Sequence, residues 1–463
     1  MTNDEFLNNN LKHDCSSFII HRSSFIISNS HTLFSMKIYN NPDKSLWADI
    51  LKRPAIDTTT LFGTVAPILK DIKANGDKAV RKYALTFDKS DTKKLLVSKK
   101  EFQDAGNQLD TELKKAILTA KSNIERFHKT QKSGVKVVKT MTGIDCWRKS
   151  VGIERVGLYI PGGTAPLLST VLMLGVPAKI AGCREVVLCT PSQRNEPIHP
   201  AILFAAKAVG IKKVFKVGGV QAIAAMAYGT ESVPQVWKIF GPGNQYVTAA
   251  KQLVNTEGIA IDMPAGPSEV MVIADNTARP KFVAADLLSQ AEHGIDSQVV
   301  LVAFDEIMVK NILQEVDNQL LTLPRAEFAR AALSNSVAVI VKNDADALAV
   351  ANYYAAEHLI ISTENADVLA EQVVNAGSVF IGHFSPESVG DYASGTNHVL
   401  PTNGFARAYS GVSVDSFVKK ITFQRLNTEG VKNIGATVIA MAEAEQLMAH
   451  ANAVRVRLEE ING

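Results

Sequence analysis

The segment Gln290-Ala-Glu-His293 places an amide and an imidazole three residues apart at the end of an expected helix over 280–293. In a helix, Asp286, Gln290 and His293 share one face. An amide oxygen and an imidazole on one face can reach the same metal ion. The alternative is a polar outer face whose histidine interacts favourably with the dipole at the helix C-terminus. Taken alone, this motif favours the polar outer face over a metal site.

Glu357 and His358 stand side by side at the start of an expected strand over 358–362. A carboxylate beside an imidazole is a plausible acid–base pair, because histidine titrates near neutral pH and the pKa of a glutamate can be raised. Neighbouring residues of a strand point to opposite faces, so both can face one pocket only at a strand end or in a loop. An exposed pair in a loop is the alternative.

Further candidate ligands lie towards the C-terminus. The segment 385–412 is expected to be a long polar loop, and long loops in compact domains are usually functional. Its first part carries Glu387, Asp391, Asn397 and His398. Glu445 and His450 share an expected helix over 442–454, on different faces, so a joint role requires an enclosing pocket. Taken singly, each of these side chains could be an ordinary surface residue.

Cys183 and Cys189 flank or occupy an expected buried strand over 185–189. A catalytic thiolate needs a polar, electropositive setting. We therefore interpret both as small core residues, with a thiohemiacetal at Cys189 as the alternative.

Three glycine clusters follow expected strands and precede expected helices: Pro161-Gly162-Gly163, Gly218-Gly219 and Gly241-Pro242-Gly243. Open α/β sheets bind ligands at the carboxyl ends of their strands, where the N–H groups of a helix start can hold a phosphate. None of the clusters matches the G-x-G-x-x-G fingerprint. Tight strand-to-helix turns are an equally good interpretation.

Two units of alternating strands and helices must position these residues. The expected strands of the first are 156–160, 185–189, 213–217 and 236–240, and those of the second are 269–274, 298–303, 337–341, 358–362 and 378–381. Such alternation predicts parallel sheets covered by helices. We expect an α/β fold with two Rossmann-like parallel-sheet units and helical segments at the N- and C-terminal ends.

Composition narrows the class of protein. Lysine plus arginine is 49 and aspartate plus glutamate is 46, so the net charge of +3 does not indicate a nucleic-acid partner. A hydrophobic content of 46% excludes disorder over most of the 463 residues. No apolar run reaches the roughly 18 residues of a membrane span. Four cysteines make no disulfide framework, so we expect a cytoplasmic protein.

The first 35 residues differ from the rest. They are rich in Asn and Ser and repeat Ser-Ser-Phe-Ile-Ile at 16–20 and 23–27. Polar residues interrupt both apolar triplets, which argues against a secretory signal. We interpret 1–35 as a disordered extension and hypothesise that translation starts at Met36, where the regular pattern begins.

Six longer motifs occur in a fixed order. They are Gly157-Leu-Tyr-Ile-Pro-Gly-Gly-Thr-Ala165, Phe240-Gly-Pro-Gly-Asn244, Asp262-Met-Pro-Ala-Gly-Pro-Ser-Glu269, Leu288-Ser-Gln-Ala-Glu-His-Gly294, Glu357-His-Leu-Ile360 and Asp391-Tyr-Ala-Ser-Gly-Thr-Asn-His-Val-Leu-Pro401. In order and spacing they closely resemble the histidinol dehydrogenase family. The resemblance runs from about 146 to 455 and more loosely back to 37, and residues 1–35 have no counterpart in it.

The resemblance implies a zinc-dependent, NAD-linked oxidation of L-histidinol to L-histidine through histidinaldehyde, the last step of histidine biosynthesis. It implies one zinc ion per subunit, with ligands Gln290, His293, Asp391 and His450. The acid–base pair would be Glu357 and His358, and the NAD contacts would be Tyr159, Gln221 and Asn244. The substrate would meet the zinc ligands, His358, Ser268, His398 and Glu445.

The resemblance also implies a homodimer with exchanged segments, in which Glu445 and His450 complete the partner's site. We accordingly expect 57–159 and 267–412 to form a larger catalytic α/β domain and 160–266 a second α/β domain that contributes to NAD binding. Residues 36–56 would be an N-terminal helical segment, and 413–463 a C-terminal helical segment exchanged in the dimer.

Two other functions remain open from the residues alone. A zinc hydrolase could use the same ligands with Glu357 activating water, and it would need no NAD. A non-catalytic two-lobed binding protein would need neither metal nor base. NADH formation from L-histidinol, with and without a chelator, separates these alternatives.

Overall fold

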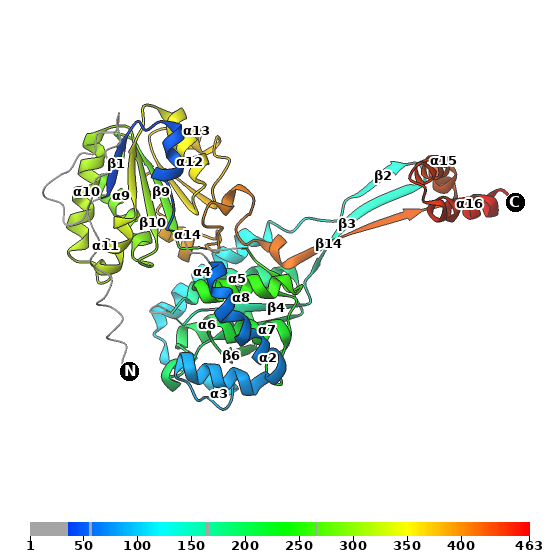
Figure 1. Cartoon of the computed structure of the whole chain (residues 1–463), viewed down its shortest axis with the longest axis horizontal. Helices are drawn as coiled ribbons and strands as arrows, with labels where there is room; N and C mark the ends of the chain where they lie inside the picture. Colours follow the sequence, from blue (N-terminus) through cyan, green and yellow to red (C-terminus); the bar gives the residue numbers. More distant parts are fainter. Residues whose placement is uncertain (1–35, 55–57, 163–165, 264–265) are drawn as a thin grey trace.

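The computed structural model describes residues 36–54, 58–162, 166–263 and 266–463 (Figure 1). Within these ranges the chain forms two parallel sheets and a three-stranded antiparallel arm. The expected α/β fold with two parallel-sheet units is confirmed. The expectations for residues 1–35 lie outside the described residues.

The first unit is a six-stranded parallel sheet of order β1-β11-β10-β9-β12-β13. Its strands are β1 (Lys37–Asn40), β9 (Glu269–Ala274), β10 (Gln298–Ala303), β11 (Val337–Ile340), β12 (His358–Ser362) and β13 (Ser378–Ile381). Every residue of β9 and β10 is buried, because helices cover both faces of the sheet. The edge strand β1 lies in the segment that we expected to be helical.

Helices cover this sheet in two layers. One face packs against α9 (Pro280–Ala291), α10 (Glu306–Leu320) and α11 (Ala326–Ser334). The other face packs against α1 (Trp47–Ile50), α12 (Asp344–Tyr354) and α13 (Ala366–Ala370). The expected helix over 280–293 ends at Ala291, so His293 lies just beyond its end.

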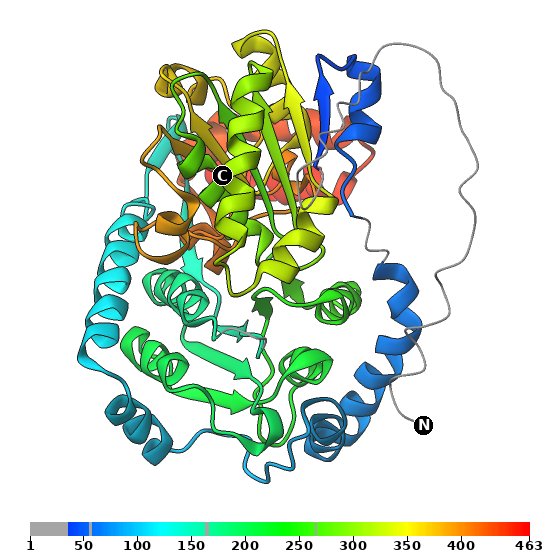
Figure 2. The same ribbon diagram turned by 90° about the vertical axis from the view of Figure 1, so that its left-hand side faces the viewer.

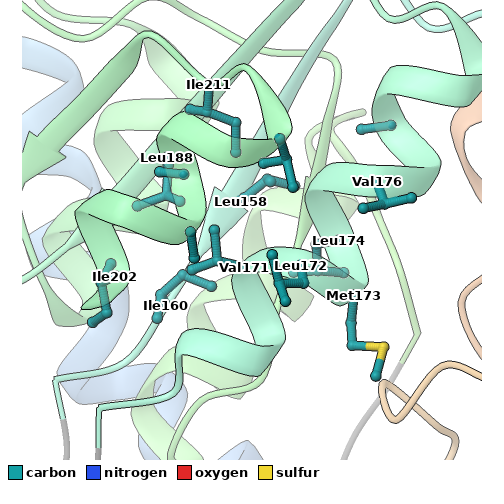
Figure 3. Close-up of a cluster of buried hydrophobic side chains, with 14 of the residues drawn as sticks. Leu158, Ile160, Val171, Leu172, Met173, Leu174, Val176, Leu188, Ile202 and Ile211 are labelled. Carbon is teal, nitrogen blue, oxygen red and sulfur yellow. The ribbon is translucent and has the colours of Figure 1, made fainter. Parts of the chain in front are cut away.

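The second unit is a five-stranded parallel sheet of order β6-β5-β4-β7-β8. Its strands are β4 (Arg155–Tyr159), β5 (Glu185–Thr190), β6 (Lys213–Lys216), β7 (Lys238–Phe240) and β8 (Ala260–Ile261). Helices α5 (Leu168–Ala181) and α6 (Pro200–Val209) cover one face, and α7 (Gly219–Tyr228) and α8 (Gln245–Thr256) cover the other. Figure 3 shows the first of these cores, with Leu158 among the buried side chains.

Three further helices belong to this second unit. They are α2 (Phe62–Tyr83), α3 (Lys99–Gln108) and α4 (Thr111–Lys129), which pack against α7, α6 and α5 respectively. This packing differs from the expected domain boundaries, which placed 57–159 with 267–412. The apolar stripe of a helix shows that it packs on a core, but it does not show which sheet that helix covers.

The antiparallel arm joins β2 (Val137–Met141), β3 (Ile144–Gly152) and β14 (Val418–Leu426) in the order β14-β3-β2. Figure 1 shows the arm leaving the two units, with α15 (Thr428–Ala444) and α16 (Met448–Asn462) at its far end. Figure 2 shows the two units one above the other, with the far end of the arm behind the upper one. Sequence analysis did not predict β14 within the C-terminal segment.

Two local expectations are wrong. The expected helix over 442–454 is broken, because α15 ends at Ala444, Gln446 has a φ of 59° and α16 begins at Met448. Glu445 and His450 therefore do not share a helix. The expected loop over 385–412 contains a short helix, α14 (Glu387–Tyr392).

Among the described residues, no helix is long and apolar enough to cross a membrane.

Replacing Leu158 with alanine tests the core of the five-stranded unit. Leu158 is fully buried in β4, so Leu158→Ala should lower the free energy of unfolding by about 2–5 kcal/mol through lost burial and a cavity. Leu118→Ala is the matched control, since Leu118 on α4 is 48% exposed and its loss should cost less than about 0.5 kcal/mol. Urea denaturation followed by circular dichroism measures both. Equal losses would contradict the described core.

Candidate active site

The candidate site lies where the amino edge of the six-stranded sheet faces the carboxyl edge of the five-stranded sheet. A cleft of about 760 Å³ is lined by Ser268 and His293 from the first edge and by Pro161 and Asn244 from the second. Ser268 directly precedes β9, whereas Pro161 and Asn244 follow β4 and β7. Both units therefore contribute walls to one cleft.

Glu357 and His358 lie at the start of β12, next to this amino edge. The parallel register pairs His358 with Val270, so the start of β12 lies beside the start of β9. Glu357 is 7% exposed and His358 is 2% exposed. Glu357 Oε2 accepts a hydrogen bond of 2.9 Å from the backbone N–H of Glu269 and lies 3.6 Å from His358 Nδ1. The pair is thus buried at a strand end, where both side chains can serve one site.

The electrostatics of the pair are dominated by desolvation and mutual attraction. Burial raises the pKa of Glu357 to about 8, because the charged form loses its hydration. Burial alone would lower the pKa of His358, but the carboxylates of Glu357 and Asp391 outweigh it and raise that pKa to about 10. Perturbed acid and base groups in a cleft are typical of catalytic sites.

Gln290 is fully buried at the end of α9, directly beside this pair. Its Nε2 lies 3.2 Å from His358 Nδ1, and it lies 3.3 Å from the carbonyl oxygen of Glu269 and 3.4 Å from Glu357 Oε2, two oxygens that accept hydrogen bonds. These two acceptors fix the orientation of the amide. Gln290 Oε1 has no hydrogen-bond partner among the described residues. A buried acceptor without a partner is costly, which indicates that a donor or a cation belongs there.

Asp391 reaches the site from α14. Its Oδ1 lies 3.1 Å from His358 Nε2. Burial alone would raise the pKa of Asp391, but the hydrogen bond from His358 holds it below its ordinary value. The backbone carbonyl of Asp391 lies 2.8 Å from Nδ1 of His398, whose Nε2 lies 3.0 Å from the hydroxyl of Thr170. Asp391 and His398, seven residues apart in the expected loop, are thus brought together.

His293 stands at the mouth of the cleft, beyond the end of α9. The residue as a whole is exposed, and its Nδ1 lies 3.4 Å from Ser268 Oγ. Desolvation by the surrounding protein lowers the pKa of His293, and burial likewise lowers that of His398. Both imidazoles are therefore held towards the neutral form, which is the form that binds metals.

The donor set of one chain is incomplete. In the parts of the chain that the structure describes, no three His, Cys, Asp or Glu side chains lie close enough to hold a metal ion. Gln290, His293 and Asp391 supply an amide oxygen, an imidazole and a carboxylate, a set that suits zinc. The unpartnered Gln290 Oε1 supports the fit. A zinc ion bound here would need a further ligand from outside this cluster.

Glu445 and His450 are not part of this site within the chain. Both are exposed at the far end of the arm, in the connection between α15 and α16 and in the first turn of α16 (Figure 1). Of the predicted site residues, these two are the ones that the fold of a single chain leaves far from the cleft.

Three predicted cofactor contacts lie at the carboxyl edge of the five-stranded sheet. Tyr159 ends β4, and its hydroxyl accepts a 3.1 Å hydrogen bond from the N–H of Gly219. Gln221, in the first turn of α7, is fully buried. Asn244 caps α8 by accepting hydrogen bonds from the N–H groups of Tyr246 and Val247. The N-termini of α7 and α8 thus lie at this edge, as in sites that hold phosphate groups.

Two residues that the sequence did not indicate, Asp88 and Arg53, hold side chains at or beside the site in place. Asp88, at the end of the turn after α2, accepts a 2.8 Å hydrogen bond from Gln221 Nε2. Arg53 forms a bidentate ion pair with Glu269 at 2.6 and 3.0 Å, which neutralises a second buried carboxylate beside Glu357. These partners are more than 130 residues apart in sequence, so no local pattern indicates them.

Cys189 is fully buried in β5, and burial raises the pKa of its thiol far above the ordinary value. A thiol in this setting is not a reactive nucleophile. The thiohemiacetal alternative therefore finds no support, and the interpretation of Cys189 as a core residue agrees with its burial.

Three comparisons with known proteins agree on one family. The family model "Histidinol dehydrogenase" matches residues 51–458. Histidinol dehydrogenase of Bacteroides thetaiotaomicron is 60% identical over 426 residues, which are 92% of this chain and 100% of that protein. The chloroplastic histidinol dehydrogenase of Arabidopsis thaliana is 52% identical over 432 residues, 92% of each chain.

A solved structure agrees with this result. The crystal structure of histidinol dehydrogenase from Elizabethkingia anophelis matches with a TM-score of 0.92 and 52% identity, covering 94% of this chain and 100% of that one. Because sequence, family model and fold agree over most of its length, the chain belongs to the histidinol dehydrogenase family.

Proposed function

We propose that this chain oxidises L-histidinol to L-histidine through histidinaldehyde, with zinc and two molecules of NAD, as the last step of histidine biosynthesis. One observation carries the proposal: the buried Glu357 and His358 adjoin an unpartnered buried ligand atom, Gln290 Oε1. Family membership supports the same reaction, because the relatives bear the name histidinol dehydrogenase.

We propose that Gln290, His293 and Asp391 hold zinc, together with His450 of a second subunit. When bound, zinc would supply a Lewis acid that orients the substrate, and NAD would accept hydride in each oxidation. Asp391 Oδ1 presently contacts His358 Nε2, and one oxygen cannot serve both partners fully. A turn of Asp391 towards the metal would free His358 Nε2 to face the substrate hydroxyl. It would also remove one of the carboxylates that raise the pKa of His358, which favours the neutral ring that a base requires.

His358 would act as the base in both oxidations. Its Nδ1 lies 3.2 Å from the carbonyl oxygen of Glu269, which can only accept a hydrogen bond. Gln290 Nε2 lies at the same distance from Nδ1. We assign the proton to Nδ1, directed at this carbonyl, so that in the neutral ring the lone pair is on Nε2. Nε2 would remove the hydroxyl proton of L-histidinol as hydride leaves the same carbon, and later the proton of the aldehyde hydrate.

Glu357 would activate water between the two oxidations. The carboxylate would take one proton from a water molecule while the oxygen of that water bonds to the aldehyde carbon. The carbonyl oxygen would receive the proton that His358 took up in the first oxidation, which gives the hydrate and leaves His358 neutral for the second oxidation. Burial favours this role, because a pKa of about 8 makes Glu357 a stronger base than an ordinary glutamate. The same reasoning predicts that hydration depends on ionised Glu357 and rises with pH through this range.

The remaining predicted residues would bind the reactants. Ser268 and His398 flank the ligand set and would contact L-histidinol. Asn244, which lines the opposite wall of the cleft, would contact NAD together with Tyr159 and Gln221 at the same edge of the five-stranded sheet, where Asp88 holds the amide of Gln221. Reactants bound between the two sheets would then lie next to the buried bases at the start of β12.

The proposed assembly is a homodimer with shared sites. The arm and its tip expose apolar side chains that a single chain leaves uncovered: Val137, Val138, Ile421, Met441, Leu447, Met448 and Val456 are each more than 40% exposed. So many exposed apolar side chains on one projecting element favour an interface there. A second copy that received this arm would obtain Glu445 and His450 for its own cleft.

A chelator experiment tests the overall proposal. The purified chain should form two NADH per L-histidinol, lose this activity after zinc removal, and regain it when zinc is restored. NADH absorbance measures each stage, and circular dichroism checks that the chelated protein stays folded. Hydrolytic activity without NAD would favour a zinc hydrolase, and binding without turnover would favour a two-lobed binding protein.

Two substitutions separate the roles of the neighbouring bases. Glu357→Gln should slow oxidation of histidinaldehyde by roughly 10²-fold or more while oxidation of the alcohol falls less, because only hydration needs this carboxylate. His358→Asn should slow both oxidations by a similar factor. Single-turnover NADH formation from L-histidinol and from histidinaldehyde measures the two steps. An equal loss of both steps in Glu357→Gln would contradict its assigned role.

A hybrid dimer tests the shared site. His450→Asn should lower zinc affinity, and Glu357→Gln should block turnover, so each homodimer should be nearly inactive. In a hybrid of the two variants, one cleft combines an intact Glu357 with the intact His450 of the other chain, so activity should return. Co-expression with two affinity tags isolates the hybrid. Hybrids as inactive as the two homodimers would show that each chain uses its own His450.

A further inference from the structure

A hydrogen bond joins the two helices that carry predicted zinc ligands. Ser289 Oγ in α9 lies 2.6 Å from Oε1 of Glu387, the first residue of α14. Glu387 is 1% exposed, which is unusual for a glutamate without an ion-pair partner. The two residues are 98 positions apart in sequence, so the contact is purely tertiary.

The Ser289–Glu387 hydrogen bond lies close in sequence to two of the proposed zinc ligands. Ser289 directly precedes Gln290, and Glu387 lies one helical turn before Asp391. Residues four apart in a helix stand on the same face. The position of Glu387 relative to Ser289 therefore sets the position of Asp391 relative to Gln290.

Helix α14 depends on such contacts for its position. It has six residues, and helices this short are not stable on their own. Its C-terminal end is held by Asn123, which donates a 3.0 Å hydrogen bond to the carbonyl of Ala393, and by the contact of His398 with the carbonyl of Asp391. Ser289 is the polar contact that the structure gives Glu387 at the other end.

The donors and acceptors of Ser289 and Glu387 determine which substitutions preserve the hydrogen bond between them. Ser289 Oγ lies 2.8 Å from the carbonyl of Asp286 and 2.6 Å from Glu387 Oε1, but the hydroxyl has one proton. Burial raises the pKa of Glu387 to about 7, so its acid form is accessible and can donate to Ser289. Glutamine at position 387 can donate or accept in the same place, whereas alanine can do neither.

Stability alone does not explain this residue. Glu387 Oε2 is buried and has no hydrogen-bond partner among the described residues. A buried polar atom without a partner costs free energy, roughly 1–3 kcal/mol. A side chain that is kept at such a cost beside a catalytic site is more readily explained by function than by packing.

We propose that the Ser289–Glu387 hydrogen bond positions α14 so that Asp391 and Gln290 are preorganised to bind one zinc ion. Glu387 is thus a positioning residue that acts through Asp391. The inference rests on the proposed zinc ligands. Partners that orient metal ligands typically contribute 10–100-fold to metal affinity.

Zinc affinity of the full-length apoprotein tests the proposal directly. Competition with a chromophoric chelator gives the zinc dissociation constant without any catalytic assay. Glu387→Ala and Ser289→Ala should each weaken zinc binding by roughly 10–100-fold, whereas Glu387→Gln should stay within about threefold of the parent chain because it keeps the hydrogen bond. Should Glu387→Ala fail to fold, Ser289→Ala carries the same test.

Asp317→Asn is the matched control, because Asp317 in α10 is a carboxylate 9% exposed with a buried unpartnered oxygen, outside the site. Its zinc affinity should equal that of the parent. Parental affinity in folded Glu387→Ala and Ser289→Ala would overturn the proposal, as would a Glu387→Gln variant as weak as Glu387→Ala. If the parent chain itself bound no zinc, the proposed function would fail before the positioning role is tested.

Discussion

The site depends on keeping a carboxyl group and an imidazole out of water at one strand end. Glu357 and His358 are both almost fully buried, and transfer of a charged group from water is expensive unless partners compensate. The backbone N–H of Glu269 and the amide of Gln290 provide this compensation for Glu357. Burial makes Glu357 a stronger base, and the donors from β9 and α9 keep its ionised form accessible in this buried position.

The site also depends on neutralisation of the charge on Glu269, which lies beside Glu357. Glu269 would add another buried negative charge beside Glu357, but Arg53 pairs with it through two hydrogen bonds and stacks over the ring of Tyr354. Arg53 comes from the segment that also carries β1 and α1. The N-terminal part of the fold thus has an electrostatic role at the site, which explains why this segment is attached to the sheet that holds the bases.

The sequence predicted strands and helices correctly wherever a local pattern of residues determines the structure. The apolar runs at 269–274, 298–303 and 358–362 predicted β9, β10 and β12 with their observed bounds, because a strand buried on both faces has no polar interruption. The predictions failed for β14, which is mostly exposed and lacks such a run, and for the break at Gln446. Contacts such as Ser289–Glu387 and Gln221–Asp88 have no local signal, since both partners look like surface residues in sequence.

Most candidate ligands and bases could be singled out by residue type, but their roles were assigned only through several long motifs taken together, and geometry explains why. Glu445 and His450 stand on an exposed tip, where burial and spacing give neither of them a function. A site divided between chains leaves each chain with an incomplete ligand set, so its affinity for metal rises only on assembly. The proposed division would couple catalysis to dimer formation. An isolated chain would hold both bases but would lack the complete set of zinc ligands that orients the substrate.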